Sequence, residues 1–158
     1  MKKIIAGVDE VGRGSLIGPV YAAAVIFKHN LNKNIIKDSK KISKKKREIL
    51  EKYIKKNCYW SIGSASLREI EKFNILNASL IAMKRAIKKL NKKPTLILID
   101  GSKAPKIKKH NVKSVVKGDE KVPQISAASI IAKVARDKVI KKMSKKFKKY
   151  AWDKNAGY

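Results

Sequence analysis

The chain opens on the stretch that most constrains its fold: an apolar run, two adjacent acids and a glycine-arginine-glycine turn. Residues 4–8 predict a buried strand. Asp9 and Glu10 follow directly, and residues 12–14 mark the turn where this strand ends. Two carboxylates at the end of a buried strand are costly to ionise, because burial and mutual repulsion both oppose their charge. A divalent cation would remove that cost, although an acidic pair taken alone is more often an ordinary feature of a solvated loop.

Two further apolar runs stop at an acid. Residues 95–99 predict a buried strand that ends at Asp100, and residues 112–116 predict a strand that ends at residues 117–120. The whole chain has only 12 acids, so their recurrence at strand ends is a pattern rather than general surface acidity. The acids in question are Asp9, Glu10, Asp100 and Asp119. Carboxylates are the ligands that Mg²⁺ and Mn²⁺ prefer, and such a cluster can hold two ions about 4 Å apart for phosphodiester cleavage.

The rest of the chain alternates apolar runs with helical patterns. Residues 19–27 and 59–65 predict two more strands. Helices are expected after Ser43, over residues 67–73, from Asn74 or Asn77 to about residue 90, and from residue 122 onward. We therefore expect an α/β fold, a mixed five-stranded sheet with helices packed on it, in a single domain of residues 1–158. Ligands of such sheets gather outside the strand ends, where the four acids fall.

The helix after Ser43 carries one apolar face. This face is expected to consist of Ile49, Leu50, Tyr53 and Ile54. Its first turn, residues 44–46, is all lysine, which the helix dipole disfavours. Either compositional drift placed these lysines there, or an anion lies nearby.

The charge balance indicates a polyanionic partner. Forty basic residues against 12 acids give a formal net charge of +28, which favours nucleic acid first and an anionic membrane surface second. Of the 40 basic residues, 35 are lysine, so part of the charge reflects a compositional bias toward lysine. The sign of the net charge favours phosphate binding, but because of this bias the size of the charge is weaker evidence for it.

Other classes of chemistry have weaker signals. Cys58 is the only cysteine, which excludes an internal disulfide and fits a core position in a reducing compartment. His29 and His110 lack metal-ligand spacing, and we expect both at the surface. No run approaches the roughly 20 apolar residues that a membrane span requires, and no signal peptide is present. We expect a cytoplasmic protein that does not bind membranes.

Several motifs, collinear over nearly the whole chain, resemble the type II ribonuclease H family, ribonuclease HII. They are Gly-Val-Asp-Glu-Val-Gly-Arg-Gly at 7–14 with Gly-Pro-Val at 18–20, Asp-Ser-Lys-Lys at 38–41, Asn-Ile-Leu-Asn-Ala at 74–78, Ile-Asp-Gly at 99–101, Val-Val-Lys-Gly-Asp at 115–119, the helical run at 126–137 and Gly-Tyr at 157–158. The resemblance implies a ribonuclease H-like fold. It also implies an endonuclease that cleaves the RNA strand of RNA–DNA hybrids and ribonucleotides embedded in duplex DNA, leaving 3′-hydroxyl and 5′-phosphate ends.

The resemblance also assigns roles to individual residues. The expected ligands of Mg²⁺ or Mn²⁺, with two ions, are Asp9, Glu10, Asp100 and Asp119. The expected substrate contacts are Gly12, Arg13 and Gly14 at the 2′-hydroxyl of the RNA–DNA junction, Ser39 and Lys40 at phosphates, and Tyr158 at the sugar after the junction. Glycines suit a site where a ligand touches backbone, and the 2′-hydroxyl is what separates RNA from DNA. Arg136 and Asp137 are interpreted as a pair on the helix surface or behind the metal ligands.

Two other functions stay open at this point. The family pattern continues beyond the Gly-Tyr motif at which this sequence stops, so we expect a domain that is short at its C-terminus. A shortened relative could be a non-catalytic, basic nucleic-acid-binding protein, and a different nuclease on the same fold, such as a junction resolvase, is the third interpretation. In each case the expected partner is a nucleic acid, and we expect a monomer.

Overall fold

The computed structural model describes residues 2–15, 17–29, 31–37, 41–151 and 154. Three predicted substrate contacts, Ser39, Lys40 and Tyr158, lie outside the described residues. The elements, in chain order, are β1 (Ile5–Val11), β2 (Val20–Phe27), α1 (Lys33–Lys37), α2 (Lys44–Asn57), β3 (Cys58–Ala65), α3 (Leu67–Lys89), β4 (Leu96–Asp100), β5 (Val112–Val115), α4 (Gly118–Lys121), α5 (Pro123–Lys146) and the 3₁₀ helix η2 (Lys148–Tyr150).

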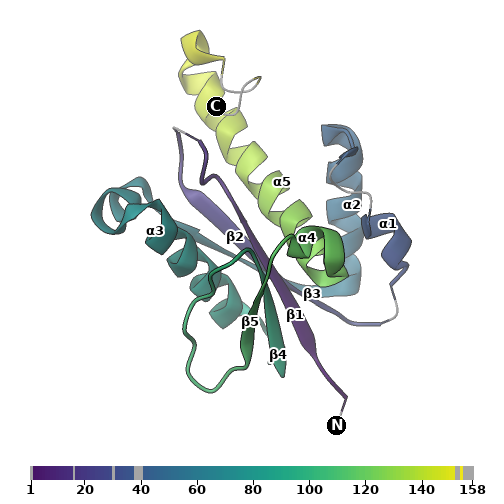
Figure 1. The fold of residues 1–158 in the computed structure, drawn as a ribbon. Coiled ribbons are helices and arrows are strands. Elements are labelled where there is room, and N and C mark those ends of the chain that lie inside the picture. Colours follow the sequence, from purple (N-terminus) through teal and green to yellow (C-terminus); the bar gives the residue numbers. More distant parts are fainter. Residues whose placement is uncertain (1, 16, 30, 38–40, 152–153, 155–158) are drawn as a thin grey trace.

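The predicted mixed five-stranded sheet is confirmed. The strand order is β3-β2-β1-β4-β5, with β1 at the centre. β1 pairs antiparallel with β2, and β2 antiparallel with β3. β1 pairs parallel with β4, and β4 parallel with β5. The carboxyl ends of β1, β4 and β5 therefore meet at one edge of the sheet (Figure 1).

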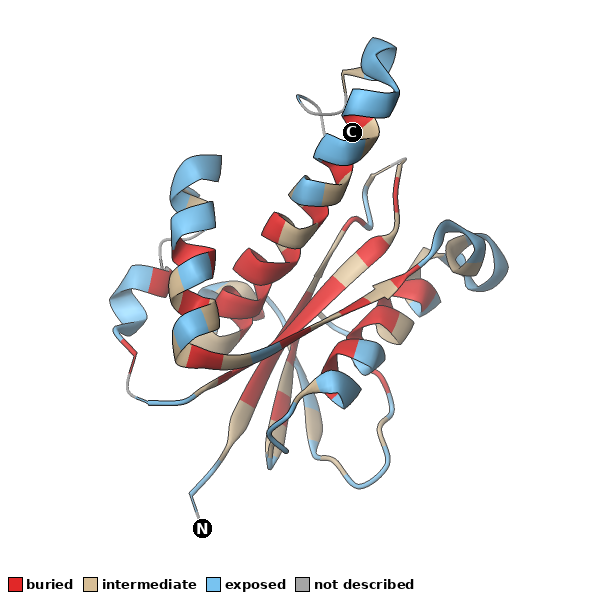
Figure 2. Cartoon of the chain, turned by 180° about the vertical axis from the view of Figure 1, so that it is seen from behind, coloured by how far each residue is buried: buried red, intermediate tan, exposed pale blue. Residues whose placement is uncertain are grey.

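Helices cover both faces of this sheet. α3 lies on one face, whereas α5, with α1 and α2 beside it, lies on the other (Figure 1). Residues of β2 alternate between the two sides, because successive side chains of a strand point to opposite faces. Ala22 and Ala24 belong to the core under α3, and Ala23 and Val25 to the core under α5. Figure 2 shows the buried residues along the strands and the inner sides of the helices.

Two of the predicted helix starts are confirmed. The Ser43 hydroxyl accepts a hydrogen bond from the Lys46 amide, so Ser43 caps α2. Within α3, Asn74 has a φ of 68° and its side chain accepts a hydrogen bond from the Asn77 amide at 3.0 Å. α3 thus consists of two helical segments, as predicted, and Asn74 rather than Asn77 caps the second.

Two local predictions were wrong. Ile49 is 62% exposed, because the buried side of α2 is formed by Leu50 and Ile54, four residues apart, and Ile49 points away from it. Asp119 does not end a strand: the chain forms the one-turn helix α4 between β5 and α5. Asp9, Glu10 and Asp100 are within the last residues of their strands rather than beyond them.

Across the described residues, no helix is both long enough and apolar enough to cross a membrane.

Candidate active site

The two adjacent acids of β1 point to opposite faces of the sheet, because side chains of a strand alternate. Asp9 is 6% exposed and lies on the face that α5 covers. Glu10 is half-buried and lines a small cavity of about 150 Å³ on the α3 side, with Leu80 and Met83 in its wall. The two acids are adjacent in the sequence, but their carboxylates lie on opposite faces of the sheet near the carboxyl end of β1.

Asp100 and Asp119 lie at the same edge of the sheet. Asp100 ends β4 and lines the same cavity as Glu10. Its Oδ1 accepts a hydrogen bond from the backbone N–H of Asp119 at 3.2 Å. A Cβ at Gly118 would lie 2.6 Å from Ile125 Cδ1 and 3.3 Å from Asp100 Oδ1, so a larger residue there would displace the side chains of Ile125 and Asp100. The fold thus brings all four predicted acids to the end of the sheet where β1, β4 and β5 stop. This group of Asp9, Glu10, Asp100 and Asp119 is called the acidic edge below.

Burial and like charge control the titration of two of these acids. The pKa of Asp9 is raised well above its usual value, first by burial and then by the charges of Glu10 and Asp100. Hydrogen bonds from Ser129 and from the Glu10 amide, at 2.8 Å, act in the opposite direction. Burial also raises the pKa of Glu10, against the lowering effect of Arg13. Asp9, Glu10 and Asp100 therefore share one electrostatic environment.

The acids suit a hard divalent cation by their chemistry. A buried carboxylate whose charge is disfavoured by its surroundings is stabilised by a nearby cation, and all the available donors are oxygens, as Mg²⁺ and Mn²⁺ require. Within the described ranges, no three acidic, histidine or cysteine side chains already converge on one point as a complete ligand group. The donor set fits such an ion, and the side chains would need to turn toward it.

The glycine-arginine-glycine turn lies beside the acids. Gly12 is buried with a φ of +105°, a conformation that favours glycine, whereas Arg13 and Gly14 are exposed. Arg13 Nη1 lies 3.4 Å from Glu10 Oε1, and Arg13 lines the same cavity as Glu10 and Asp100. The turn therefore exposes backbone and one cationic side chain directly next to the acidic edge.

Arg136 has a different place from the one predicted. It is 2% exposed, and its Nη2 donates a hydrogen bond to the Ile17 carbonyl at 3.0 Å. A Cβ at Gly12 would lie 2.9 Å from Arg136 Nε, so the guanidinium packs directly under the turn. Asp137 instead pairs with Arg47 of α2 at 3.4 Å. Arg136 and Asp137 thus do not form the predicted pair, and the surface position was wrong for Arg136.

A signal for the burial of Arg136 was present in the sequence. It follows Ala132 by four residues and precedes Ile140 by four, and both of these residues are buried on the inner side of α5. A charged residue in the middle of an apolar helical face needs a polar partner, and the carbonyl of Ile17 supplies one. Helical periodicity could therefore have predicted an inward-facing arginine, though not its partner.

The cysteine and the two histidines, for which the sequence predicted no catalytic role, do not line the cavity at the acidic edge. Cys58 is buried, and burial raises the pKa of its thiol to about 12, so it is a core residue rather than a reactive thiolate, as predicted. His29 is exposed. His110 is half-buried, with Nδ1 3.0 Å from the Lys108 carbonyl.

The fold and the acidic edge together define a ribonuclease H-like architecture, and comparison with known proteins specifies it. The family model for ribonuclease HII matches residues 6–158. Ribonuclease HII of Pelagibacter ubique (strain HTCC1062) is 66% identical over 156 residues, which cover 99% of this chain and 84% of that protein. Ribonuclease H2 of Pyrococcus horikoshii OT3 superposes with a TM-score of 0.82 at 28% identity, covering 98% of this chain and 80% of the other.

A second solved structure agrees. A chain of the PCNA–RNase HII complex from Archaeoglobus fulgidus superposes with a TM-score of 0.80 at 30% identity, covering 91% of this chain and 78% of that chain. This chain therefore belongs to the ribonuclease HII family. It is an endoribonuclease with the ribonuclease H-like fold. Family membership thus favours the first of the three functional interpretations over the binding protein and the junction resolvase.

Proposed function

We propose that this enzyme cleaves the RNA strand of RNA–DNA hybrids and also duplex DNA at embedded ribonucleotides, leaving 3′-hydroxyl and 5′-phosphate ends. The observation that carries the proposal is the buried Asp9 carboxylate at the end of the central strand, within electrostatic range of Glu10 and Asp100. A buried group of like charges is unfavourable for folding, which is typical of a catalytic centre rather than of a structural feature.

The proposed metal ligands are the four acids at the sheet edge, and the ions are Mg²⁺ or Mn²⁺, two in number. When bound, such ions activate water and stabilise the leaving oxygen of a phosphodiester. Asp9 supplies a carboxylate that Ser129 and the Glu10 amide hold in place. The Asp119 amide orients Asp100 through its hydrogen bond to Oδ1. Glu10 and Arg13 form the wall of the cavity next to these groups.

The proposed reader of the RNA–DNA junction is the turn of Gly12, Arg13 and Gly14. Exposed backbone at Gly14 leaves room for a sugar to approach, the left-handed Gly12 shapes the turn, and the 2′-hydroxyl can both donate and accept a hydrogen bond. The cationic Arg13 beside this turn suits a neighbouring phosphate. Ser39 and Lys40 stay predicted phosphate contacts, and Tyr158 a predicted sugar contact.

A panel of labelled substrates tests the proposed function. It contains an RNA–DNA hybrid, a DNA duplex with a single ribonucleotide, an all-DNA duplex and a four-way DNA junction, each incubated with Mg²⁺, with Mn²⁺ or with EDTA. Cleavage of the first two alone, dependent on divalent cation and leaving a 5′-phosphate, is the expected result. Binding that falls steeply with salt but gives no turnover would instead establish the non-catalytic protein, and cleavage of the junction alone would establish the resolvase.

Arg136 should act as a positioning residue for the turn. In Arg136→Met the buried guanidinium and its bond to the Ile17 carbonyl are lost, so the backbone at Gly12 is no longer held. We expect kcat/KM on the single-ribonucleotide duplex to fall by about tenfold to a hundredfold, the typical cost of a misplaced binding group. Steady-state kinetics measure this, and thermal unfolding records stability separately.

The control for this variant is Arg68→Met, which removes an exposed arginine at the start of α3. It should leave kcat/KM within about twofold, since surface substitutions rarely alter packing. Arg136→Lys, which keeps a cationic donor, should recover part of the loss. A lowered melting temperature of Arg136→Met with unchanged kcat/KM would show that the residue only stabilises the fold.

A further inference from the structure

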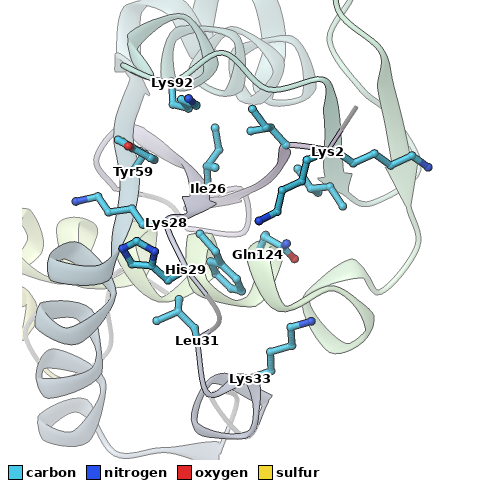
Figure 3. A pocket seen from close by; sticks show the side chains of 13 residues that line it. Lys2, Ile26, Lys28, His29, Leu31, Lys33, Tyr59, Lys92 and Gln124 are labelled. Atoms are coloured by element: carbon cyan, nitrogen blue, oxygen red, sulfur yellow. The ribbon is translucent and has the colours of Figure 1, made fainter.

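A larger hollow lies at the opposite end of the sheet from the acids. Its volume is about 740 Å³, and it lies where residues 2–5, the end of β2, the start of β3 and the loop before β4 meet (Figure 3). Ile5, in its wall, precedes Asp9 by four residues of β1, which corresponds to about 13 Å along the strand. None of its lining residues belongs to the candidate active site.

The rim of this hollow is cationic. Its lysines come from four separate parts of the chain: the segment before β1, the loop after β2, helix α1 and the loop before β4. They are Lys2, Lys3, Lys28, Lys33 and Lys92, and no Asp or Glu is among the lining residues. Figure 3 shows Lys92 and Lys33 at opposite ends of the hollow. In the part of the chain that the structure describes, none of the five forms an ion pair, so their charge is available to a ligand.

The floor of the hollow is apolar and partly aromatic. Ile26 and Leu31 are buried, and Phe27 and Tyr59 are half-buried. Lys28 Nζ lies 5.2 Å from the centroid of the Tyr59 ring, so the aromatic face is already next to a cation. An open surface patch of lysines would have no such floor. Small-ligand sites typically have volumes of roughly 300–1,000 Å³, and the volume of the hollow falls in this range.

We propose that this hollow binds a phosphorylated nucleoside. Lysines around the rim match the charge of phosphates, and an aromatic ring beside an apolar floor matches the flat face of a base. Two sources share this chemistry, a nucleotide unit of a single-stranded nucleic acid and a free nucleotide. The inference is independent of the proposed reaction, because the hollow shares no residue with the acidic edge.

The triple variant K28Q/K33Q/K92Q tests the proposal. A short fluorescein-labelled oligothymidylate, which an endoribonuclease does not cleave, is titrated in one arm, and a fluorescent adenosine triphosphate analogue in the other. If the strand is the ligand, its affinity should fall by about tenfold and the slope of log K against log salt should shrink by about two, at roughly 0.7 per phosphate contact of a single strand. If the free nucleotide is the ligand, the loss should appear in the second arm instead.

The lysine-rich composition requires a matched control. K52Q/K56Q/K84Q removes the same charge from exposed positions of α2 and α3, none of which lines the hollow. Lower net charge weakens the binding of any anion slightly. This control should therefore lower both affinities by no more than about twofold. Equal losses in the two triple variants, or no loss in either arm, would overturn the proposal. Tyr59→Leu, which keeps an apolar side chain but removes the aromatic face, should weaken the same arm as K28Q/K33Q/K92Q.

Discussion

Asp9→Asn should abolish cleavage of an RNA–DNA hybrid while leaving hybrid binding within a few-fold of the wild type. The amide has the size of the carboxylate, so packing under α5 is kept, but the charge that would hold a divalent cation is lost. A metal-stabilised transition state loses several kcal/mol, which corresponds to a rate reduction of at least about a thousandfold. Asp100→Asn should have the same effect. Single-turnover cleavage and fluorescence anisotropy measure the two properties separately.

The same variant should respond differently to metal in thermal unfolding. Burial and neighbouring charge raise the pKa of Asp9, so the fold loses stability as the pH rises from the unfolded to the folded pKa of this group, and this loss persists at higher pH. Removing the charge therefore should not lower the melting temperature in EDTA. Adding Mg²⁺ or Mn²⁺ should raise the melting temperature of the wild type by mass action, but that of Asp9→Asn far less.

The matched control is Asp137→Asn. This acid also lies in a family-like motif, but it pairs with Arg47 of α2 at 3.4 Å and does not line the cavity of Glu10 and Asp100. It should keep cleavage within a few-fold and keep the metal-induced rise in melting temperature. Full hybrid cleavage by Asp9→Asn would show that the acidic edge is not the catalytic centre, and an equal loss in Asp137→Asn would show that the effect is not specific to that edge.

Four of the strands were predictable from the sequence to within one residue at each end, and β1 runs three residues further than predicted. β1, β2 and β4 are nearly continuous apolar runs, because helices cover both faces of the centre of the sheet and bury most side chains of these strands. The acids at the ends of β1 and β4 were predictable for the same reason, since they interrupt such a run. The local caps at Ser43 and Asn74 depend only on neighbours three residues away, so they too were predictable.

Contacts between distant residues were not predictable. The pairing of Ile5 with Leu96 joins strands about ninety residues apart in the chain, and no local pattern specifies it. The hydrogen bond from Arg136 to the Ile17 carbonyl spans a still greater separation. The hollow lined by Lys2, Lys33 and Lys92 exists only because separate segments converge. Sequence patterns report which face of an element is buried, whereas partners across the core come from the tertiary fold.

Gly7→Ala should destabilise the fold strongly, although it adds only one methyl group. A Cβ at Gly7 would lie 2.1 Å from the carbonyl carbon of Gln124 and 2.2 Å from the amide nitrogen of Ile125. Both atoms are backbone of the first turn of α5, so no side-chain rotation can relieve the overlap. α5 would have to move away from the central strand. We expect a loss of about 3 kcal/mol or more, at the upper end of the cost of overpacking a core.

Thermal unfolding followed by circular dichroism measures this loss, which should lower the melting temperature by roughly 6–12 °C for a chain of this size. Ser114→Ala, at an exposed position of β5, is the control and should shift it by no more than about 2 °C. An unchanged melting temperature of Gly7→Ala would show that α5 does not pack this closely on β1. Because Asp9 lies two residues further along the same face, and Ser129 of α5 holds its carboxylate, any displacement of α5 should also disturb the acidic edge. Cleavage by the folded fraction of Gly7→Ala should therefore fall below the activity of an equal amount of folded wild type.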